Sequence, residues 1–197
     1  KKLERMGFEN LGIMIPVGSD EDFTDQLIDQ YGEAIQEFNN AILNGSMNAE
    51  TLKQRFFGFH ATLGKDDLIH RPGEYGQVQE EELNQLFQYL FSDQAERDVA
   101  KDPAAVAAHV FVTLVNLQGF NDGNKRAANL MMNYVLLKAG YTPFVLTPDN
   151  AFQYLSLVTL PEDAEEFTVN EARFKHFLRS QVSSREAPRP ANQSRDS

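Results

Sequence analysis

The feature that constrains the fold most is the run from Ala127 to Ala139, which is apolar on nearly every side when it is placed on a helix. A helix of this kind has no face suited to water, so it has to lie inside the molecule with other elements packed around it. Gly140 follows the run, and glycine commonly ends a helix. We therefore expect one buried central helix, around which the rest of the chain is arranged.

A second apolar helix is expected immediately before it. Asp102 and Pro103 form a typical helix start, with aspartate as the cap and proline at the first helical position. The apolar residues that follow recur at helical spacing and make one stripe, which comprises Val106, Val110, Leu114 and Leu117. The sequence therefore predicts a central helix pair joined by a polar loop.

Further helices are expected on both sides of this pair. Apolar residues recur at helical spacing over about 20–43, 48–57 and 80–98, and a further helix is expected from about Asp149. The last helix is expected to open with a capping box from Thr168 to Glu171. Its apolar face would consist of Phe174, Phe177 and Leu178.

The segment from Gly58 to Gln79 interrupts the helical pattern, because it contains glycines, a proline and a charged cluster at residues 65–67. Short β-type fragments between these turn signals predict an extended loop or a small hairpin. The predicted fold class is thus all-α, with one hairpin-like insertion before the central helix pair. From Ser183 onward almost no apolar residue occurs, which is typical of a disordered tail.

Bulk composition narrows the class of function. A chain of 197 residues, of which 42% are hydrophobic, is long enough for one domain with a packed core. Its formal charge of −11 argues against general affinity for nucleic acids or anionic membranes, because both bind basic surfaces. No cysteine occurs, which excludes disulfides, a thiolate nucleophile and cysteine-bound metals. Because no apolar run approaches about 20 residues, no membrane span is expected. A cytoplasmic location suits these properties.

The polar loop between the two central helices, GFNDGNKR, has the composition of an anion site. Gly123 would let the backbone approach a phosphate, and the N–H groups at the start of the next helix would point toward it. Asn124 can donate through its amide, Lys125 adds a positive charge, and Arg126 can hold a phosphate with two hydrogen bonds. Asp122 suits Mg²⁺, which usually takes one or two carboxylates in addition to substrate phosphates.

Other residues of the loop and of the following helix support this interpretation. Phe120 would anchor the turn in the core, while Lys125, Asn129 and Asn133 recur every fourth residue and would continue the polar face. The alternative is an ordinary surface turn followed by a helix with solvated cations, since Asp-Gly-Asn is common turn chemistry. Composition alone leaves both interpretations open. Walker A and GxGxxG patterns are absent from the sequence, so P-loop and Rossmann sites are excluded.

The stretch from Pro103 to Pro143 is similar to the core of the Fic/Doc (Fido) family. That family carries the motif His-Pro-Phe-x-Asp/Glu-Gly/Ala-Asn-Gly/Lys-Arg after a helix of the type Ala-Ala-x-x-His-x-x-Phe. Ala107, His109 and Val112 sit on that preceding helix here, and the loop residues that match the motif in order are Phe120, Asp122, Gly123, Asn124, Lys125 and Arg126. The Asn-Lys-Arg sequence, and Asn129 in place of a second arginine, resemble the Doc branch.

The resemblance implies a Fido-type helical bundle that extends in outline over residues 56–182, after an N-terminal helical extension at 1–55 and before the tail at 183–197. It implies transfer of AMP from ATP, or of a related phosphate-containing group, to a hydroxyl of a target protein. Asp122 would bind Mg²⁺, and the nucleotide phosphates would be held by Gly123, Asn124, Lys125, Arg126 and Asn129. The target would dock by strand addition on a flap near Leu63 to Val78.

One position departs from the family in a way that bears on activity. Gln118 stands where the family has its catalytic histidine, and Gly119 stands where it has proline. Glutamine cannot take up a proton near neutral pH, and loss of a general base typically costs about 10²- to 10⁴-fold in rate.

The remaining histidines and the flap carboxylates are not expected to replace that base. His109 and His176 are expected to pack within their helices. The other candidates lie in or beside the predicted flap and comprise His60, His70, Asp66, Asp67 and Glu74.

Regulation is expected either to come from outside the chain or to be dispensable because the site is degenerate. Many family members carry an inhibitory helix with the pattern Ser/Thr-x-x-x-Glu-Gly/Asn. Ser46 to Glu50 and Ser92 to Glu96 begin this pattern, but the residue that follows does not complete it in either case. By analogy, control would come from a partner such as an antitoxin, and an effector of this type would act in a host cytosol.

Two hypotheses follow from the sequence. In the first, a divergent Fido enzyme keeps nucleotide and Mg²⁺ binding and modifies a protein hydroxyl. In the second, a pseudoenzyme keeps the scaffold and binds a protein or senses a nucleotide without turnover. Hydrolysis of a phosphodiester is a third, weaker hypothesis.

Overall fold

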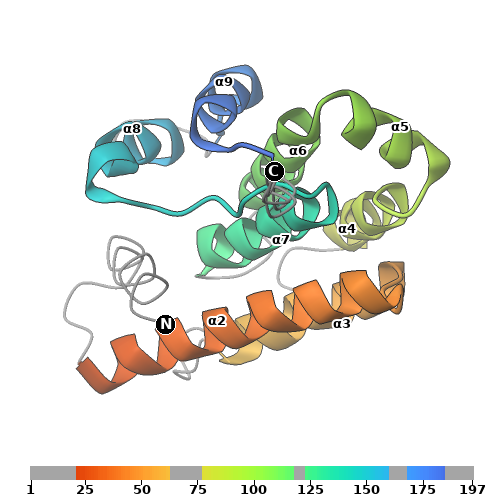
Figure 1. Cartoon of the computed structure of the whole chain (residues 1–197), viewed down its shortest axis with the longest axis horizontal. Coiled ribbons are helices and arrows are strands. Elements are labelled where there is room, and N and C mark those ends of the chain that lie inside the picture. The colour runs from red at the N-terminus through yellow and green to blue at the C-terminus, as the bar shows by residue number, and fades with distance from the viewer. Residues whose placement is uncertain (1–20, 63–76, 118–122, 160–167, 185–197) are drawn as a thin grey trace, which may run out of the picture.

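The computed structural model describes residues 21–62, 77–117, 123–159 and 168–184 (Figure 1). Within these ranges the chain forms helices α2 Glu21–Asn44, α3 Ala49–Thr62, α4 Gln77–Tyr89, α5 Asp93–Lys101, α6 Pro103–Leu117, α7 Asn124–Lys138, α8 Pro148–Val158 and α9 Glu171–Gln181. An isolated antiparallel bridge joins Tyr141 to Ser184, and the described ranges contain no strand. The predicted all-α class is therefore confirmed. In the same ranges, the helices are too short or too polar to cross a membrane.

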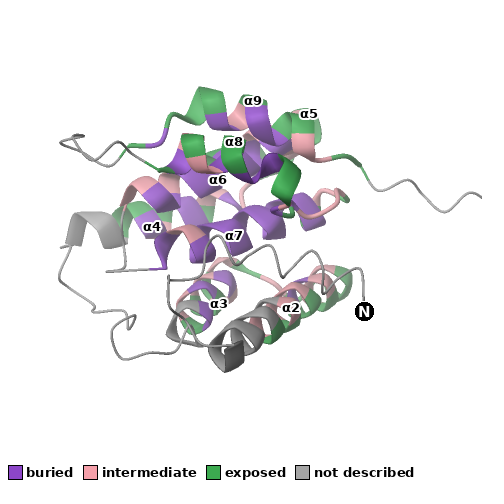
Figure 2. Cartoon of the chain, turned by 90° about the vertical axis from the view of Figure 1, so that its left-hand side faces the viewer, coloured by how far each residue is buried: buried purple, intermediate pink, exposed green. Residues whose placement is uncertain are grey.

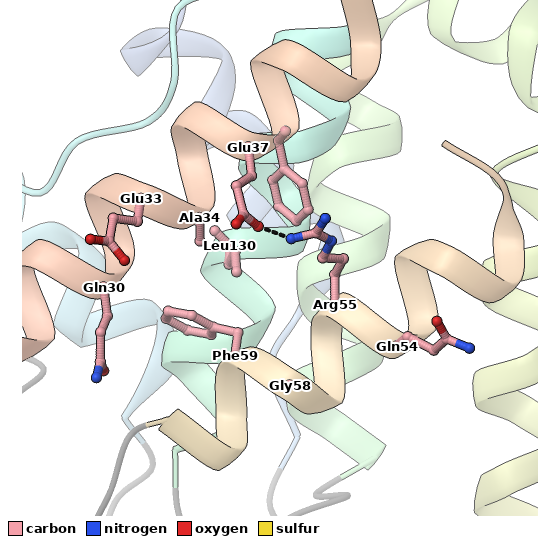
Figure 3. A pocket seen from close by; sticks show the side chains of 10 residues that line it. Gln30, Glu33, Ala34, Glu37, Gln54, Arg55, Gly58, Phe59 and Leu130 are labelled. Carbon is pink, nitrogen blue, oxygen red and sulfur yellow. Dashed lines mark ion pairs between the residues drawn. The ribbon is translucent and has the colours of Figure 1, made fainter. Parts of the chain in front are cut away.

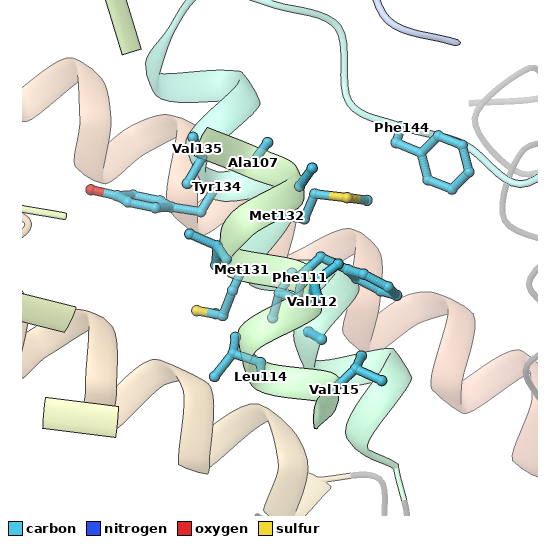
Figure 4. Close-up of a cluster of buried hydrophobic side chains, with 14 of the residues drawn as sticks. Ala107, Phe111, Val112, Leu114, Val115, Met131, Met132, Tyr134, Val135 and Phe144 are labelled. Carbon is cyan, nitrogen blue, oxygen red and sulfur yellow. The ribbon is translucent and has the colours of Figure 1, made fainter. Parts of the chain in front are cut away.

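Helices α6 and α7 form the centre of the molecule. Every residue from 126 to 137 is buried, whatever its chemistry, so α7 is enclosed along most of its length (Figure 2). Apolar side chains of the two helices pack against each other, as Figure 4 shows for Phe111 and Leu114 of α6 and Met131 and Val135 of α7. The buried helix pair predicted from the apolar pattern is confirmed.

The remaining helices lie on two sides of this pair. Figures 1 and 2 show α2 and α3 along one side of α7, and α8 and α9 on the opposite side. On the first side, the Phe38 ring of α2 meets the edge of the Tyr134 ring of α7 at 5.2 Å. Burial raises the pKa of the Tyr134 hydroxyl to about 12, so this side chain is neutral inside the core.

On the second side, aromatic rings fill the space between helices α6, α8 and α9. Phe111 of α6 stacks on Phe174 of α9, with ring centroids 4.3 Å apart. The ring centroid of Tyr154 of α8 lies 6.3 Å from that of Phe174 and 6.3 Å from that of Phe177. These rings are all but completely buried, which is why the predicted apolar face of the last helix is confirmed.

Two predicted helix boundaries are wrong, and capping side chains explain both. The single helix expected over 80–98 is α4 and α5, because Ser92 starts a new helix by accepting a hydrogen bond from the Ala95 N–H at 3.2 Å. The periodicity hides this break because Leu90 beside it is still buried. Likewise Asn170, rather than Thr168, caps the last helix and accepts from the Arg173 N–H at 3.0 Å.

The extended element predicted from Gly58 to Gln79 is also wrong at both ends. Helix α3 continues to Thr62, because Leu52, Phe56 and Phe59 form one buried stripe that passes over Gly58. Helix α4 already begins at Gln77. The small β-hairpin flap is not seen among the described residues, and the rest of the expected flap, residues 63–76, lies outside them.

Candidate functional site

Gly123 turns the chain into helix α7. Its backbone has φ +81° and ψ 5°, a left-handed conformation that glycine adopts without the steric cost of a side chain. The Gly123 carbonyl accepts the N–H of Ala127 at 3.0 Å, so the helical hydrogen bonding begins at this residue. The N–H groups of a first turn point toward the N-terminus of their helix and make this end electropositive, as in helix ends that bind anions.

The polar side chains of the first turns of α7 are held inside the protein. Exposed fractions are 9% for Asn124, 7% for Arg126 and 2% for Asn129, while Lys125 is half-buried. A buried guanidinium at the positive end of a helix is unfavourable by desolvation and by the helix dipole unless an anion lies close to it. The position of Arg126 therefore suits a site where a phosphate or a carboxylate compensates its charge.

Asn133, two turns further along α7, has a structural role instead. Its amide donates to the Phe144 carbonyl at 3.2 Å and its Oδ1 accepts the Phe144 N–H at 2.7 Å. Both polar groups of the side chain are thus used to hold the extended segment after α7. The polar face predicted to run from Lys125 through Asn133 is therefore wrong at its far end.

Three predicted site residues lie outside the described residues, namely Gln118, Phe120 and Asp122. Within the described ranges, no group of three His, Asp or Glu side chains is arranged to hold a metal ion. A magnesium site would accordingly rest on Asp122 and on the phosphates of a ligand. Such a donor set, one carboxylate with substrate oxygens, is one that Mg²⁺ commonly accepts.

Two histidine side chains are described by the structure, those of His109 and His176, and both lie at the surface. His109 is half exposed, its Nδ1 is 3.2 Å from the Glu171 carboxylate, and its ring meets Tyr89 edge to face at 6.3 Å. His109 thus joins three helices at the surface. His176 is exposed, so the prediction that it packs is wrong. His60 belongs to α3 rather than to a flap. The remaining flap candidates lie outside the described ranges, namely His70, Asp66, Asp67 and Glu74.

Two asparagines have structural roles that were not predicted from the sequence. Asn116 of α6 donates to the Val169 carbonyl at 3.3 Å and accepts the Val169 N–H at 2.7 Å, which fixes the approach to α9. Asn150 accepts the Thr147 N–H at 2.8 Å and donates to the Val145 carbonyl at 3.0 Å. A lone asparagine in an apolar stretch was the available signal for Asn116, although it does not reveal the partner.

The fold and the loop together define a class: a helical domain in which a glycine-containing polar loop opens onto a buried helix. A sequence model described as the Fic/DOC family matches residues 22–136, which is more than half of the 197-residue chain. The chain therefore belongs to the Fic/DOC family. The matched range extends from the start of α2 to the last turn of α7.

Curated relatives are similar over part of the chain. The protein adenylyltransferase Fic of Culex quinquefasciatus is 30% identical over 71 residues, which cover 36% of this chain and 14% of that protein. The protein of the same name from Drosophila grimshawi is 30% identical over 83 residues, which cover 42% of this chain and 17% of that protein. The match thus spans less than a fifth of the length of these relatives.

The fold is also found in a solved structure. The crystal structure of IbpAFic2 superposes with a TM-score of 0.55 over 92% of this chain and 62% of that chain, at 19% sequence identity. At this identity the likeness establishes the helical fold alone.

Proposed function

We propose that the chain binds the phosphates of a nucleotide at the start of α7 and transfers AMP, or a related phosphate-containing group, to a hydroxyl of a target protein. The observation that carries the proposal is the left-handed Gly123 at the N-terminus of a buried helix, with the buried Arg126 in its first turn. This arrangement joins backbone donors, a helix dipole and a guanidinium at one place, and all three favour a phosphate.

Each residue of the turn has a distinct task in this proposal. Gly123 leaves room for phosphate oxygens at the backbone, and the Asn124 amide donates to them. Lys125 adds a positive charge from its half-buried position, while Arg126 holds two oxygens with its planar fork. Asn129, one turn further along the helix, would add a side-chain amide to the phosphate-binding set. Mg²⁺, held by Asp122 and the phosphates, would neutralise charge that develops on the leaving oxygens.

The chemical step is a substitution at the α-phosphorus of ATP. A target hydroxyl oxygen forms a bond to this phosphorus, the bond to the oxygen that bridges to the β-phosphate breaks, and pyrophosphate leaves. The hydroxyl proton has to be removed during the step. Gln118 can orient the hydroxyl by accepting its hydrogen bond, but the proton itself has to pass to water. We therefore expect slow transfer, in which positioning and charge stabilisation supply most of the catalysis.

The target would approach over the segment between α3 and α4, near Leu63 to Val78, as the family resemblance implies. A regulatory partner such as an antitoxin is part of the same proposal.

A second candidate function is nucleotide binding without turnover. It is favoured by the identity of residue 118, because a glutamine at the position of the family's base removes the group that takes the proton. The two candidates share the phosphate site and differ only in the chemical step, so one measurement tests the shared site and a second separates the candidates.

The first measurement is calorimetric titration of the chain with ATP and Mg²⁺. We expect saturable binding, and Arg126→Ala should weaken it by about 10- to 100-fold, because a charge-assisted hydrogen-bond pair is lost. Arg126→Lys should be intermediate, since it keeps the charge but not the fork. Arg173→Ala, which removes an exposed arginine of α9, is the control and should bind as the unaltered chain does. Absence of binding in the unaltered chain would refute both candidates.

The second measurement follows label transfer from ATP carrying a labelled α-phosphate to proteins of a cell lysate. Slow transfer by the unaltered chain, increased by Gln118→His and lost in Arg126→Ala, supports the enzyme. Nucleotide binding without transfer, with transfer gained only in Gln118→His, supports the second candidate.

A further inference from the structure

The side of the molecule formed by α2 and α3 contains a groove that the proposed function does not use. It has a volume of about 310 Å³ and runs between the two helices down to Leu130 of α7. Its floor is apolar, and Figure 3 shows Phe59 of α3 projecting into the space between the two helices, with Ala34 of α2 and Leu130 nearby. The groove therefore offers an apolar surface at its base and solvent at its mouth.

The wall that α2 contributes to this groove is acidic. Glu33 and Glu37 line the groove and are exposed, and Asp29 lies one turn before them on the same ridge of the helix. The sequence of α2 contains no lysine or arginine that could neutralise them from within the helix. Like charges four residues apart destabilise a helix, so the charge pattern is unfavourable unless cations from outside α2 compensate it.

Among the described residues, one cation from outside α2 compensates this row of carboxylates. Arg55 of α3 forms an ion pair with Glu37 across the groove, with both side chains about half exposed (Figure 3). Glu33, one turn away, makes no ion pair with any residue that the structure describes. The groove thus already binds one guanidinium, that of Arg55, at Glu37. It also has a second carboxylate, that of Glu33, one helical turn away.

Gly58 gives independent support for an external occupant. It lines the groove from the interior of α3, where a glycine weakens a helix relative to alanine. A Cβ atom built on Gly58 would meet no atom within 4 Å, so packing inside the chain does not require glycine here. A glycine in this position keeps the mouth of the groove open to an approaching chain.

We propose that this groove docks a basic segment of a partner protein. An arginine or lysine of that segment lies with its aliphatic stem over Phe59 and Ala34 and places its charged head beside Glu33. The choice of occupant follows from charge complementarity, because long cationic side chains are apolar along the stem and charged at the tip, as the groove is apolar at the floor and acidic at the rim. Docking is independent of the nucleotide site.

The test is fluorescence anisotropy of the whole chain with a labelled dodecapeptide in which arginine alternates with leucine and alanine. A matched peptide carries citrulline, the neutral isostere, in place of arginine. We expect micromolar affinity for the arginine peptide, at least about tenfold weaker binding of the citrulline peptide, and affinity that falls as salt is raised. Equal binding of the two peptides would overturn the proposal.

Matched variants locate the binding. Glu33→Gln should weaken the arginine peptide about fivefold, whereas Glu82→Gln, the same charge change at an exposed position of α4, should not. Gly58→Leu should abolish binding by filling the groove, with circular dichroism confirming that the variant is folded. Arg126→Ala should bind the peptide as the unaltered chain does. If Glu82→Gln matches Glu33→Gln, or Gly58→Leu has no effect, the attraction is diffuse and the groove is not the site.

A last experiment removes the cations that precede α2 in this chain. Lys1, Lys2 and Arg5 precede α2 in the sequence and have the chemistry of the proposed occupant. The proposal expects the peptide to bind the unaltered chain. Binding that appears only after Lys1→Ala, Lys2→Ala and Arg5→Ala are combined would show that the chain occupies its own groove, and would overturn the assignment to a partner.

Discussion

The two sides of the central helix pair are built differently. On the α8–α9 side, the rings of Phe111, Phe174 and Phe177 are at most 1% exposed, and asparagine side chains hold the connections between helices. On the α2–α3 side, a groove of about 310 Å³ remains, and a half-exposed ion pair crosses it. The α8–α9 side packs chiefly on α6, through α9, whereas the α2–α3 side packs on α7.

This difference separates scaffold from available surface. A side that is filled at the density of a protein interior has no room for another chain without displacing its own side chains. A side that keeps a groove open, at the cost of a helical glycine and a row of like charges, retains surface that its own packing does not need. This contrast should appear in the stability of variants on the two sides.

The largest effect is expected on the filled side. Phe174→Ala should lower the free energy of unfolding by about 3–5 kcal/mol, because it leaves a closed cavity beside Phe111. Phe59→Ala should cost less, because it enlarges a groove that is already open to solvent. Urea denaturation of both variants measures the difference, and equal losses would contradict the contrast between the two sides.

A smaller effect is expected at the asparagine that holds the segment after α7. Asn133→Ala leaves the buried N–H and carbonyl of Phe144 without their partner, which should cost about 1–3 kcal/mol. Asn84→Ala, at a partly buried position of α4 whose side chain accepts from Lys53 at 2.6 Å, is the comparison and should cost under about 1 kcal/mol. Thermal unfolding of the two variants decides whether Asn133 is structural.

On the open side, one substitution should increase stability. Gly58→Ala should raise the free energy of unfolding by about 0.5–1 kcal/mol, because alanine favours the helix and the added Cβ meets no atom within 4 Å. Gly45→Ala is the contrasting case, since φ of +62° there disfavours alanine and stability should fall. A loss of stability in Gly58→Ala would show that the groove has no free space at this point.

The smallest effect is a dependence on pH. The Arg179 guanidinium holds the pKa of the Asp102 carboxyl below its ordinary value. A lowered pKa stabilises the folded state above the ordinary aspartate range, and this contribution is lost as the pH falls below it. Asp102→Asn keeps an acceptor for the Ala105 N–H but not the charge. The stability difference between this variant and the unaltered chain should therefore shrink in acid, and a difference that is constant with pH would contradict the ion pair's role.

The central helix pair and the first turn of α7 could be predicted from the sequence because the signals are local. Ala127 to Ala139 is apolar on nearly every side, and a Gly-Asn-Lys-Arg turn precedes it, so both the burial and the electropositive helix end follow from neighbouring residues. The break at Ser92 was missed because core residues continue through it. Gly58 was interpreted as a helix breaker. A glycine looks the same in a sequence whether it forms a turn or leaves space on the surface of a helix.

The groove could not be predicted for a different reason. Glu33 and Gly58 belong to different helices, and their proximity depends on how α2 and α3 pack against α7. The acidic pattern of α2 was visible in the sequence, but a solvated helix face carries the same pattern. Only the packed structure shows that this face borders an apolar floor.

The asparagine contacts have a consequence for hydrogen exchange. The amide protons of Phe144, Thr147 and Val169 lie outside every helix, yet each is donated to the side-chain oxygen of an asparagine. Such amides exchange with solvent only when the side chain releases them, so their protection reports the opening of the scaffold rather than of a loop. If the three amides exchange together with those of α7, the helices and their connections on this side open as one cooperative unit.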